Sequence, residues 1–261
     1  MKLSVIIPIH NEGPFLERCL NSIPEHPDVE VIAIDDASTD NSAEILQQYK
    51  DRDNFKAGYH STNWGVSMTR NHGLTMATGD FVAFQDADDA LHPKALETML
   101  RVAEEYGDAE SVIMFNHMRV YGQAMPTPRF ENNTGRYNLA NMPQKWEPVW
   151  GKLYRRSFIQ AHGFSFKQGL DYGEDELFNL ECIRECGSIF CYKAITVIKH
   201  FDNPDSLTHT LTKQKLTGLT RALEDLIEED NPPKFDAAIR QLIADHWNSK
   251  TYIKLFGRLE G

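Results

Sequence analysis

Long apolar runs are missing from this sequence. No stretch approaches the roughly 20 consecutive apolar residues that a membrane-spanning helix needs. Met1 and Lys2 lead directly into the apolar run Leu3–Ile9, and no small-residue cleavage site of a secretory signal follows it. We therefore expect a cytoplasmic protein.

Cysteine is also scarce. The four cysteines, Cys19, Cys182, Cys186 and Cys191, form no CxxC pair, which is the usual spacing of zinc fingers and thioredoxin-like redox motifs. Cys182 and Cys186 would share one helix face, so a zinc site there is the alternative. Buried small hydrophobic side chains are the better interpretation of all four.

Positive charge is deficient. Lysine and arginine number 27 against 38 aspartates and glutamates, and the net charge is -11. A protein that binds a nucleic-acid polymer normally carries a basic surface, so such a partner is not expected. An acidic protein can still bind a phosphorylated small molecule if a metal cation mediates the contact.

The sequence does contain a regular alternation of apolar runs and amphipathic segments. Strands are predicted over Leu3–Ile9, Val29–Ile34, Phe55–Tyr59, Phe81–Gln85 and Ser111–Phe115, with helices between them that include Val66–Thr78 and Pro93–Tyr106. This pattern predicts an α/β fold with a mostly parallel, Rossmann-like sheet flanked by helices. Ligands of such sheets bind beyond the carboxyl ends of the strands.

The pattern changes after residue 121. Gly122–Lys145 has no clear period and is either a binding loop or a plain surface excursion. A helix is predicted over Asp175–Cys186 and a strand over Ser188–Ile198. Two more amphipathic segments, separated by Asn231-Pro232-Pro233, predict a helical C-terminal extension.

Polar residues stand directly after three of the predicted strands. They are His10-Asn11-Glu12-Gly13, Asp35-Asp36-Ala37-Ser38-Thr39-Asp40 and Asp86-Ala87-Asp88-Asp89. The last group places three carboxylates within four residues, where they repel one another unless a cation compensates. Mg²⁺ and Mn²⁺ prefer such oxygen ligands, although a solvated acidic turn before the next helix is the alternative.

Five segments, in this order, resemble glycosyltransferase family 2. They are SVIIPIHNEGPFLERCLNSI (Ser4–Ile23), VEVIAIDDASTDNSAEIL (Val29–Leu46), NWGVSMTRNHGLTMATGDFVAFQDADD (Asn63–Asp89), WGKLYRRSF (Trp150–Phe158) and GEDELF (Gly173–Phe178). The resemblance implies a GT-A fold over residues 1–210, with a nucleotide-sugar-binding half (1–115) and an acceptor-binding half (116–210). Residues 211–261 would form the helical extension.

The resemblance also implies how the donor is bound. Pro8 and Glu12 match the loop that meets the nucleotide, and Asp36 matches the acidic residue that contacts the base. Arg70 lies in the segment that approaches the donor. Asp86 is the first carboxylate of a DxD-like motif and would contact the ribose or the transferred sugar.

The reacting groups follow from the same comparison. Asp88, the second carboxylate of the DxD-like motif, would bind a divalent cation, Mn²⁺ or Mg²⁺. His200 could complete the metal shell, with a surface histidine as the alternative. Asp175 matches the catalytic base.

Three further residues are candidates for the acceptor side. Glu174 stands beside the predicted base, and Trp150 and Lys152 could line the acceptor, since aromatic faces suit the C–H surfaces of sugars. A core tryptophan and a solvated lysine are the alternatives.

Together these features predict an inverting, metal-dependent transfer of a sugar from a nucleotide-diphosphate donor, with UDP the first candidate, to a glycan, saccharide or lipid-linked acceptor in polysaccharide or glycan biosynthesis. A catalytically silent nucleotide-sugar-binding module is one alternative. A nucleotidyltransferase is another, although His10-Asn11-Glu12-Gly13 lacks the Gly-rich, basic loop of those enzymes. Residues 250–258 alternate basic and apolar side chains, and a peripheral contact with the inner face of the membrane is one interpretation of this segment.

Overall fold

The computed structural model describes residues 1–121, 123–127, 134–138, 148–170, 172–203, 212–227 and 233–247. The strands are β1 (Leu3–Ile9), β2 (Val29–Asp35), β3 (Phe55–Tyr59), β4 (Phe81–Phe84), β5 (Ala90–Leu91), β6 (Val112–Tyr121), β7 (Gln123–Thr127), β8 (Gly135–Tyr137), β9 (Lys152–Arg155) and β10 (Ile189–His200). The helices are α1 (Gly13–Asn21), α2 (Ser42–Gln48), α3 (Val66–Met76), α4 (Ala95–Tyr106), α5 (Arg156–His162), α6 (Glu174–Cys186), α7 (Lys213–Glu224) and α8 (Pro233–Trp247).

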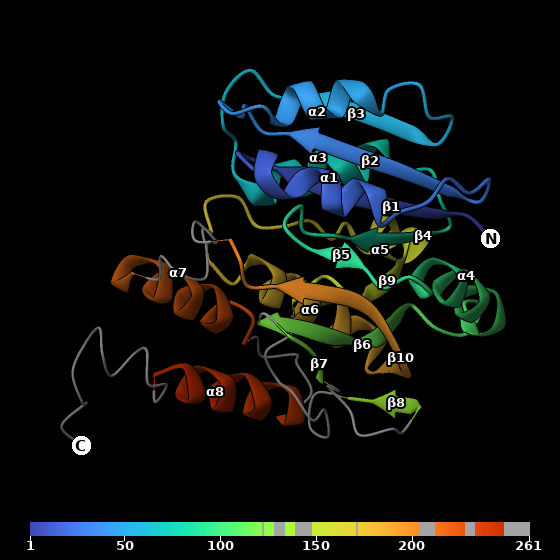
Figure 1. The fold of residues 1–261 in the computed structure, drawn as a ribbon. Helices are drawn as coiled ribbons and strands as arrows, with labels where there is room; N and C mark the ends of the chain where they lie inside the picture. The colour runs from blue at the N-terminus through green and yellow to red at the C-terminus, as the bar shows by residue number, and fades with distance from the viewer. Residues whose placement is uncertain are drawn as a thin grey trace.

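One sheet crosses the molecule in the order β3-β2-β1-β4-β9-β6-β10-β5, with β7 beside β6 and β8 beside β10. The strands β3, β2, β1 and β4 are parallel, as the sequence predicts. The second half differs, because β9 runs antiparallel to both β4 and β6, and β5, β7 and β8 also pair antiparallel. β10 nevertheless runs parallel to β6, so the sheet as a whole is mixed, with four neighbouring parallel strands in its N-terminal half (Figure 1).

Two apolar cores lie on opposite faces of this sheet. Leu3, Val5 and Ile7 of β1 point to the face that α1, α2 and α4 cover. Ile6 points to the other face, which α3, α5, α6, α7 and α8 cover. This alternation is what a central strand buried on both sides requires. Figure 1 shows α1 and α2 in front of the sheet and α3 and α6 behind it.

Close packing fixes α3 against β1. A Cβ atom on Gly73 would lie only 2.3 Å from Cγ2 of Ile6, so a larger residue would push the helix off the strand. The N-terminus of α3 then lies at the carboxyl edge of the parallel strands, where ligands of such sheets bind.

The segment predicted as an aperiodic loop, Gly122–Lys145, contains two strands, so that expectation was wrong in part. β7 pairs antiparallel with β6, and β8 pairs with the start of β10. The remainder of the segment lies outside the described residues. β6 is also longer than the predicted strand and runs to Tyr121, so the predicted boundary between residues 115 and 116 falls inside it.

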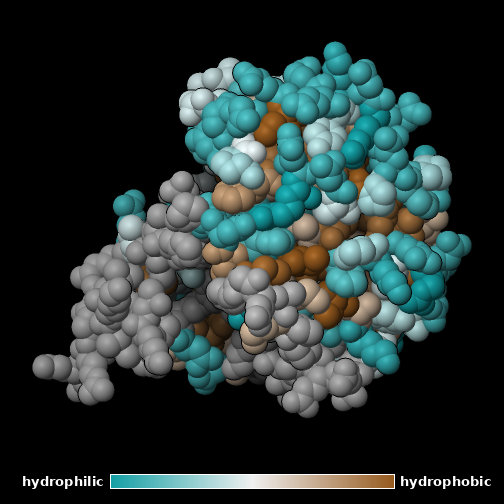
Figure 2. Space-filling view, in the orientation of Figure 1, coloured by the Kyte–Doolittle hydropathy of each residue, from teal (hydrophilic) through white to brown (hydrophobic). Residues whose placement is uncertain are grey.

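The two C-terminal helices are present as predicted and pack on the face of the sheet that carries α6. Hydrophilic side chains dominate the surface around α1 and α2 (Figure 2). Over the part of the chain that the structure describes, none of the helices combines the length and the apolar character needed to cross a bilayer. The basic and apolar residues at 250–258 lie outside the described part.

Candidate active site

Three carboxylates converge just after β4. One oxygen each of Asp86, Asp88 and Asp89 lies within 4.8 Å of the others, and these three are the only such cluster among the described residues. Asp89 is fully buried, and its Oδ1 accepts a hydrogen bond from the backbone N–H of His200 at 2.8 Å. Asp86 and Asp88 are less deeply buried and face the carboxyl edge of the parallel strands.

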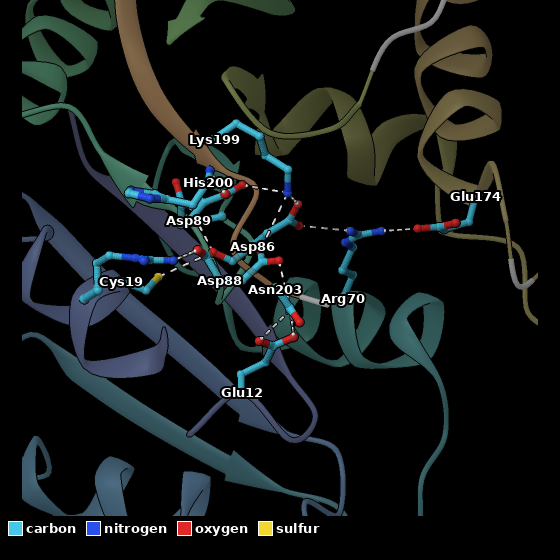
Figure 3. Close-up of polar contacts among 12 residues, drawn as sticks. Glu12, Cys19, Arg70, Asp86, Asp88, Asp89, Glu174, Lys199, His200 and Asn203 are labelled. Carbon is cyan, nitrogen blue, oxygen red and sulfur yellow. Dashed lines mark hydrogen bonds and ion pairs between the residues drawn. The ribbon is translucent and has the colours of Figure 1, made fainter. Parts of the chain in front are cut away.

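Lys199, from β10, enters this cluster (Figure 3). Its Nζ lies 2.9 Å from Asp89, 3.4 Å from Asp86 and 3.6 Å from Asp88. Burial alone would lower the pKa of Lys199, but the three carboxylates outweigh burial and raise it. The ammonium is therefore charged and balances part of the negative charge.

Glu12 lies beside the cluster and is joined to it by Asn203. Asn203 donates to Asp88 at 3.1 Å and to Glu12 at 3.3 Å, which holds the two carboxyl groups on one amide. Burial, together with the charges of Asp88 and Asp86, raises the pKa of Glu12 to about 8 although Lys199 lowers it. Glu12 is therefore mostly protonated at neutral pH.

The donor set fits a divalent cation. It consists of carboxylate oxygens, which Mg²⁺ and Mn²⁺ prefer, within 4.8 Å of one another. Asp88 and Asp86 are the two carboxylates open enough to share such an ion with donor phosphates. Asp89 is held inside by the backbone of His200, and the imidazole of His200 is not part of the cluster among the described residues.

Arg70 links the cluster to α6. Its guanidinium lies 2.6 Å from Glu174 and 3.4 Å from Asp86, and its side chain is buried (Figure 3). Burial by itself would lower the pKa of Arg70, whereas Glu174 and Asp86 raise it. Burial raises the pKa of Asp86 in turn, but Lys199 and Arg70 outweigh it and leave that pKa below its usual value.

Asp175 stands at the start of α6, next to Glu174. Gly173 precedes the helix with a φ of +77°, a conformation that favours glycine, and a Cβ there would lie 2.6 Å from Leu219. Burial and the charge of Glu174 together raise the pKa of Asp175 to about 7, although Arg70 acts in the opposite direction. A carboxyl group that titrates near neutral pH suits a general base.

Asp36 anchors the loop that follows β3 through hydrogen bonds. Its Oδ1 accepts from the backbone N–H of Trp64 and from His60, and its Oδ2 accepts from the N–H of Gly65 at 2.8 Å. Trp64 stacks on His60 at 4.1 Å yet stays 51% exposed. Asp36 thus positions an exposed aromatic ring at the carboxyl edge of the sheet.

The loops after β1 and β2 interlock at the same edge. Asn11 and Ala37 have φ angles of 58° and 55°, which are strained for residues other than glycine. The side chain of Asn11 accepts from the N–H of Thr39 at 2.7 Å. Pro8 lies at the end of β1, opposite Ile34 of β2, so the predicted nucleotide loop is built from both strands.

The predicted acceptor-side residues are engaged within the protein. Glu174 is the partner of Arg70. Lys152 is buried and donates to the carbonyl of Pro148. Trp150 is also buried, and its ring lies 6.0 Å from the ammonium of Lys199. These side chains support the wall of the site in this structure, and contact with an acceptor stays a prediction.

Sequence reasoning missed Lys199, Asn203 and the hydrogen bonds that His60 and Trp64 make. Lys199 stands beside His200, which the resemblance did single out, so the signal was the position of both at the end of the last long strand. The partners of Asn203 are 115 and 191 residues away in the chain. Nothing in local spacing indicates such a contact.

The fold is an α/β sheet, and an acidic cluster follows the carboxyl end of its parallel N-terminal strands. Residues 4–163 match the model of "Glycosyl transferase family 2", and the chain belongs to this family. The glycosyltransferase YibD of Escherichia coli is 35% identical over 66% of this chain and 53% of its own length. EpsH of Bacillus subtilis is 30% identical over 68% and 54%. The chain thus spans about half the length of these curated relatives.

Solved structures confirm the GT-A fold expected from the resemblance. TarS of Staphylococcus aureus (residues 1–349), in complex with UDP-GlcNAc, superposes with a TM-score of 0.82 at 24% identity, covering 100% of this chain and 77% of that one. The mannosyltransferase PcManGT of Pyrobaculum calidifontis, in complex with GDP-Man and Mn²⁺, has a TM-score of 0.65 at 16% identity and covers 93% and 69%.

The pH dependence of turnover provides a test of the Asp175 environment. As the predicted base, Asp175 must be deprotonated, so the rate is predicted to fall as the pH drops below about 7, its pKa. Glu174→Gln removes one of the charges that raise this pKa, and the acidic limb of kcat/KM should move to lower pH. Glu185→Gln, at the exposed end of the same helix, should leave it in place. An unmoved limb in Glu174→Gln would assign the titration to another group.

Arg70 should be a major contributor to stability. Arg70→Met leaves Glu174 without its buried cation and Asp86 with Lys199 alone, and breaking a buried pair from one side costs about 3–5 kcal/mol. The exposed pair of Arg101 with Glu105 provides the control, because Arg101→Met removes only a surface ion pair. Urea unfolding measures both, and equal free energies of unfolding for the two variants would contradict the buried network.

Proposed function

We propose that this protein transfers a sugar from a nucleotide-diphosphate donor, a UDP-sugar as first candidate, to an acceptor hydroxyl with inversion at the anomeric carbon. The observation that carries this is the convergence of the Asp86-Asp88-Asp89 cluster with Asp175. Segments 86–89 and 173–175 come together at one sheet edge, joined by Arg70. A cluster of carboxylates and a carboxyl group titrating near neutrality lie side by side there.

In this proposal the base and the donor site act from two sides of the anomeric carbon. Asp175 takes the proton of the acceptor hydroxyl as the oxygen attacks from the face opposite the leaving diphosphate, a contribution typically worth about 10²–10⁴-fold. Arg70 keeps Glu174 and Asp86 in place on either side of the site. A divalent cation held by Asp88, with Asp86 beside it, would supply positive charge at the diphosphate.

The nucleoside end of the donor belongs over the loops after β1 and β2. Pro8, Glu12 and Asp36 lie there, and Trp64 presents an exposed ring above Asp36. Names of relatives favour a UDP-sugar and a polymer acceptor, because TarS was crystallised with UDP-GlcNAc and is described as a poly(ribitol-phosphate) beta-N-acetylglucosaminyltransferase. We therefore place this chain in polysaccharide or glycan biosynthesis.

The domain assignment follows from the same reasoning. Residues 1–115 would hold the donor and residues 116–210 the acceptor, with 211–261 as a helical extension. β10 returns from the second part to deliver Lys199 into the acidic cluster, so the two parts share one site.

A donor screen tests the proposal. The protein is incubated with Mn²⁺ and a panel of nucleotide sugars, and release of free nucleoside diphosphate is followed with and without a chelator. Release from one donor that the chelator abolishes is expected, and that donor names the sugar. Binding of UDP and Mn²⁺ by calorimetry, without turnover on any donor or acceptor sugar, would instead support a silent binding module.

A further inference from the structure

The position of Lys199 has a consequence for cation binding. Its Nζ lies within 3.6 Å of all three carboxylates of the acidic cluster, and its side chain is only 16% exposed. No other lysine among the described residues is paired with more than one carboxylate group of this cluster. A protein-borne positive charge thus occupies the position where the proposed function requires a divalent cation (Figure 3).

The ammonium and a divalent cation cannot share these oxygens. Mg²⁺ binds carboxylate oxygens at about 2.0–2.1 Å, whereas Nζ already lies 3.4 Å from Asp86 and 3.6 Å from Asp88. An ion on both residues would lie a few ångströms from a buried positive charge. Charges of the same sign at that separation repel strongly where solvent screening is weak.

The side chain of Lys199 also has an alternative contact, the ring of Trp150. Its ammonium lies 6.0 Å from the centroid of the Trp150 ring, so the side chain can rotate toward an aromatic face. Asp89, its nearest partner at 2.9 Å, keeps the backbone N–H of His200 as a hydrogen-bond donor when the ammonium leaves. Oδ2 of Asp89 loses its ion-pair partner when the lysine leaves, a cost that a divalent cation bound beside it would offset.

We propose that Lys199 is an internal counter-cation that competes with the divalent metal for Asp86 and Asp88, and that metal binding displaces it from the cluster. This rests on the proposed function, which places the metal there. In the absence of donor the enzyme holds the lysine in the site and binds the metal weakly. Lys199 is thus a positioning residue, because its place in the cluster determines whether Asp86 and Asp88 are available to the metal.

Metal affinity without donor is the direct test. Calorimetric titration with Mn²⁺ alone should show Lys199→Met binding at least tenfold more tightly than the unaltered protein, because the competing charge is gone. Lys199→Arg keeps the charge and should bind as weakly as the unaltered protein. Lys193→Met, on the exposed side of the same strand, removes an equal charge outside the cluster and should change nothing.

A second measurement needs no variant and covers the case in which Lys199→Met fails to fold. Amine-labelling of the unaltered protein, mapped by mass spectrometry, should become several-fold faster at Lys199 when Mg²⁺ is added, with Lys193 as internal reference. Equal Mn²⁺ affinity in Lys199→Met, or labelling of Lys199 that Mg²⁺ leaves unchanged or slows, would overturn the competition while the metal site stands. Absence of Mn²⁺ binding in every protein, with and without UDP, would overturn both the competition and the proposed metal site.

Discussion

Asp175→Asn should lower turnover by about 10²–10⁴-fold while the affinity for the donor stays unchanged. The asparagine amide has nearly the same shape as the carboxyl group and can still accept the hydrogen bond that Asp175 receives from the N–H of Glu176 at 2.8 Å. It cannot take a proton from an attacking hydroxyl. Removal of a group that acts only in the transition state lowers kcat and leaves ground-state binding alone.

The measurement combines steady-state kinetics with a donor titration on the same preparation. Asp225→Asn is the matched control, since it makes the same chemical change at an exposed carboxylate that is paired with Lys167 and is not part of the cluster. Normal turnover in Asp175→Asn would move the base elsewhere, with Glu174 excluded by its pairing with Arg70. A lost donor affinity would instead assign Asp175 to binding.

Much of the N-terminal half of the fold could be predicted from the local pattern of apolar residues. Leu3–Ile9 and Phe55–Tyr59 were predicted with the bounds that the structure has, and β2 extends its prediction by one residue. β1 is buried on both faces and has a nearly continuous apolar sequence, whereas β3, with Lys56 and an exposed Tyr59, gives a weaker signal. The second half holds the two longest strands, β6 and β10, but also the short strands β7 and β8, which lie where the sequence showed no period.

The candidate site could likewise be predicted only in part. The acidic groups at strand ends were predictable, because the carboxyl ends of parallel strands must meet at one edge. Their partners were not. Arg70 reaches Glu174 across 104 residues and Lys199 reaches Asp86 across 113, so these contacts depend on how β10 and α6 return to the first half of the sheet. Sequence spacing can therefore predict the acidic residues of the site. It cannot predict the basic residues that the tertiary fold brings to them.

Asp88→Asn should abolish the response of the enzyme to metal and lower turnover by about 10²–10³-fold or more, the usual cost of losing one preorganised electrostatic stabiliser. Among the three carboxylates, Asp88 combines access from the donor side with contact to Asn203, which it shares with Glu12. The substitution keeps the volume and a hydrogen-bond acceptor for Asn203 and removes only the charge. We therefore expect the variant to fold and to bind Mn²⁺ far more weakly in calorimetry.

Asp86→Asn provides the sharpest comparison, because Asp86 is held between Arg70 and Lys199 and is proposed to contact the donor itself. It should weaken donor binding more than metal binding, whereas Asp88→Asn should do the reverse. Asp80→Asn, at an exposed carboxylate that accepts from the N–H of Lys2, is the control for both. If Asp88→Asn retained chelator-sensitive turnover at the unaltered rate, the cation would have to be held by other ligands. The charge on Asp88 would then serve only to anchor Asn203 and Lys199 at the edge of the sheet.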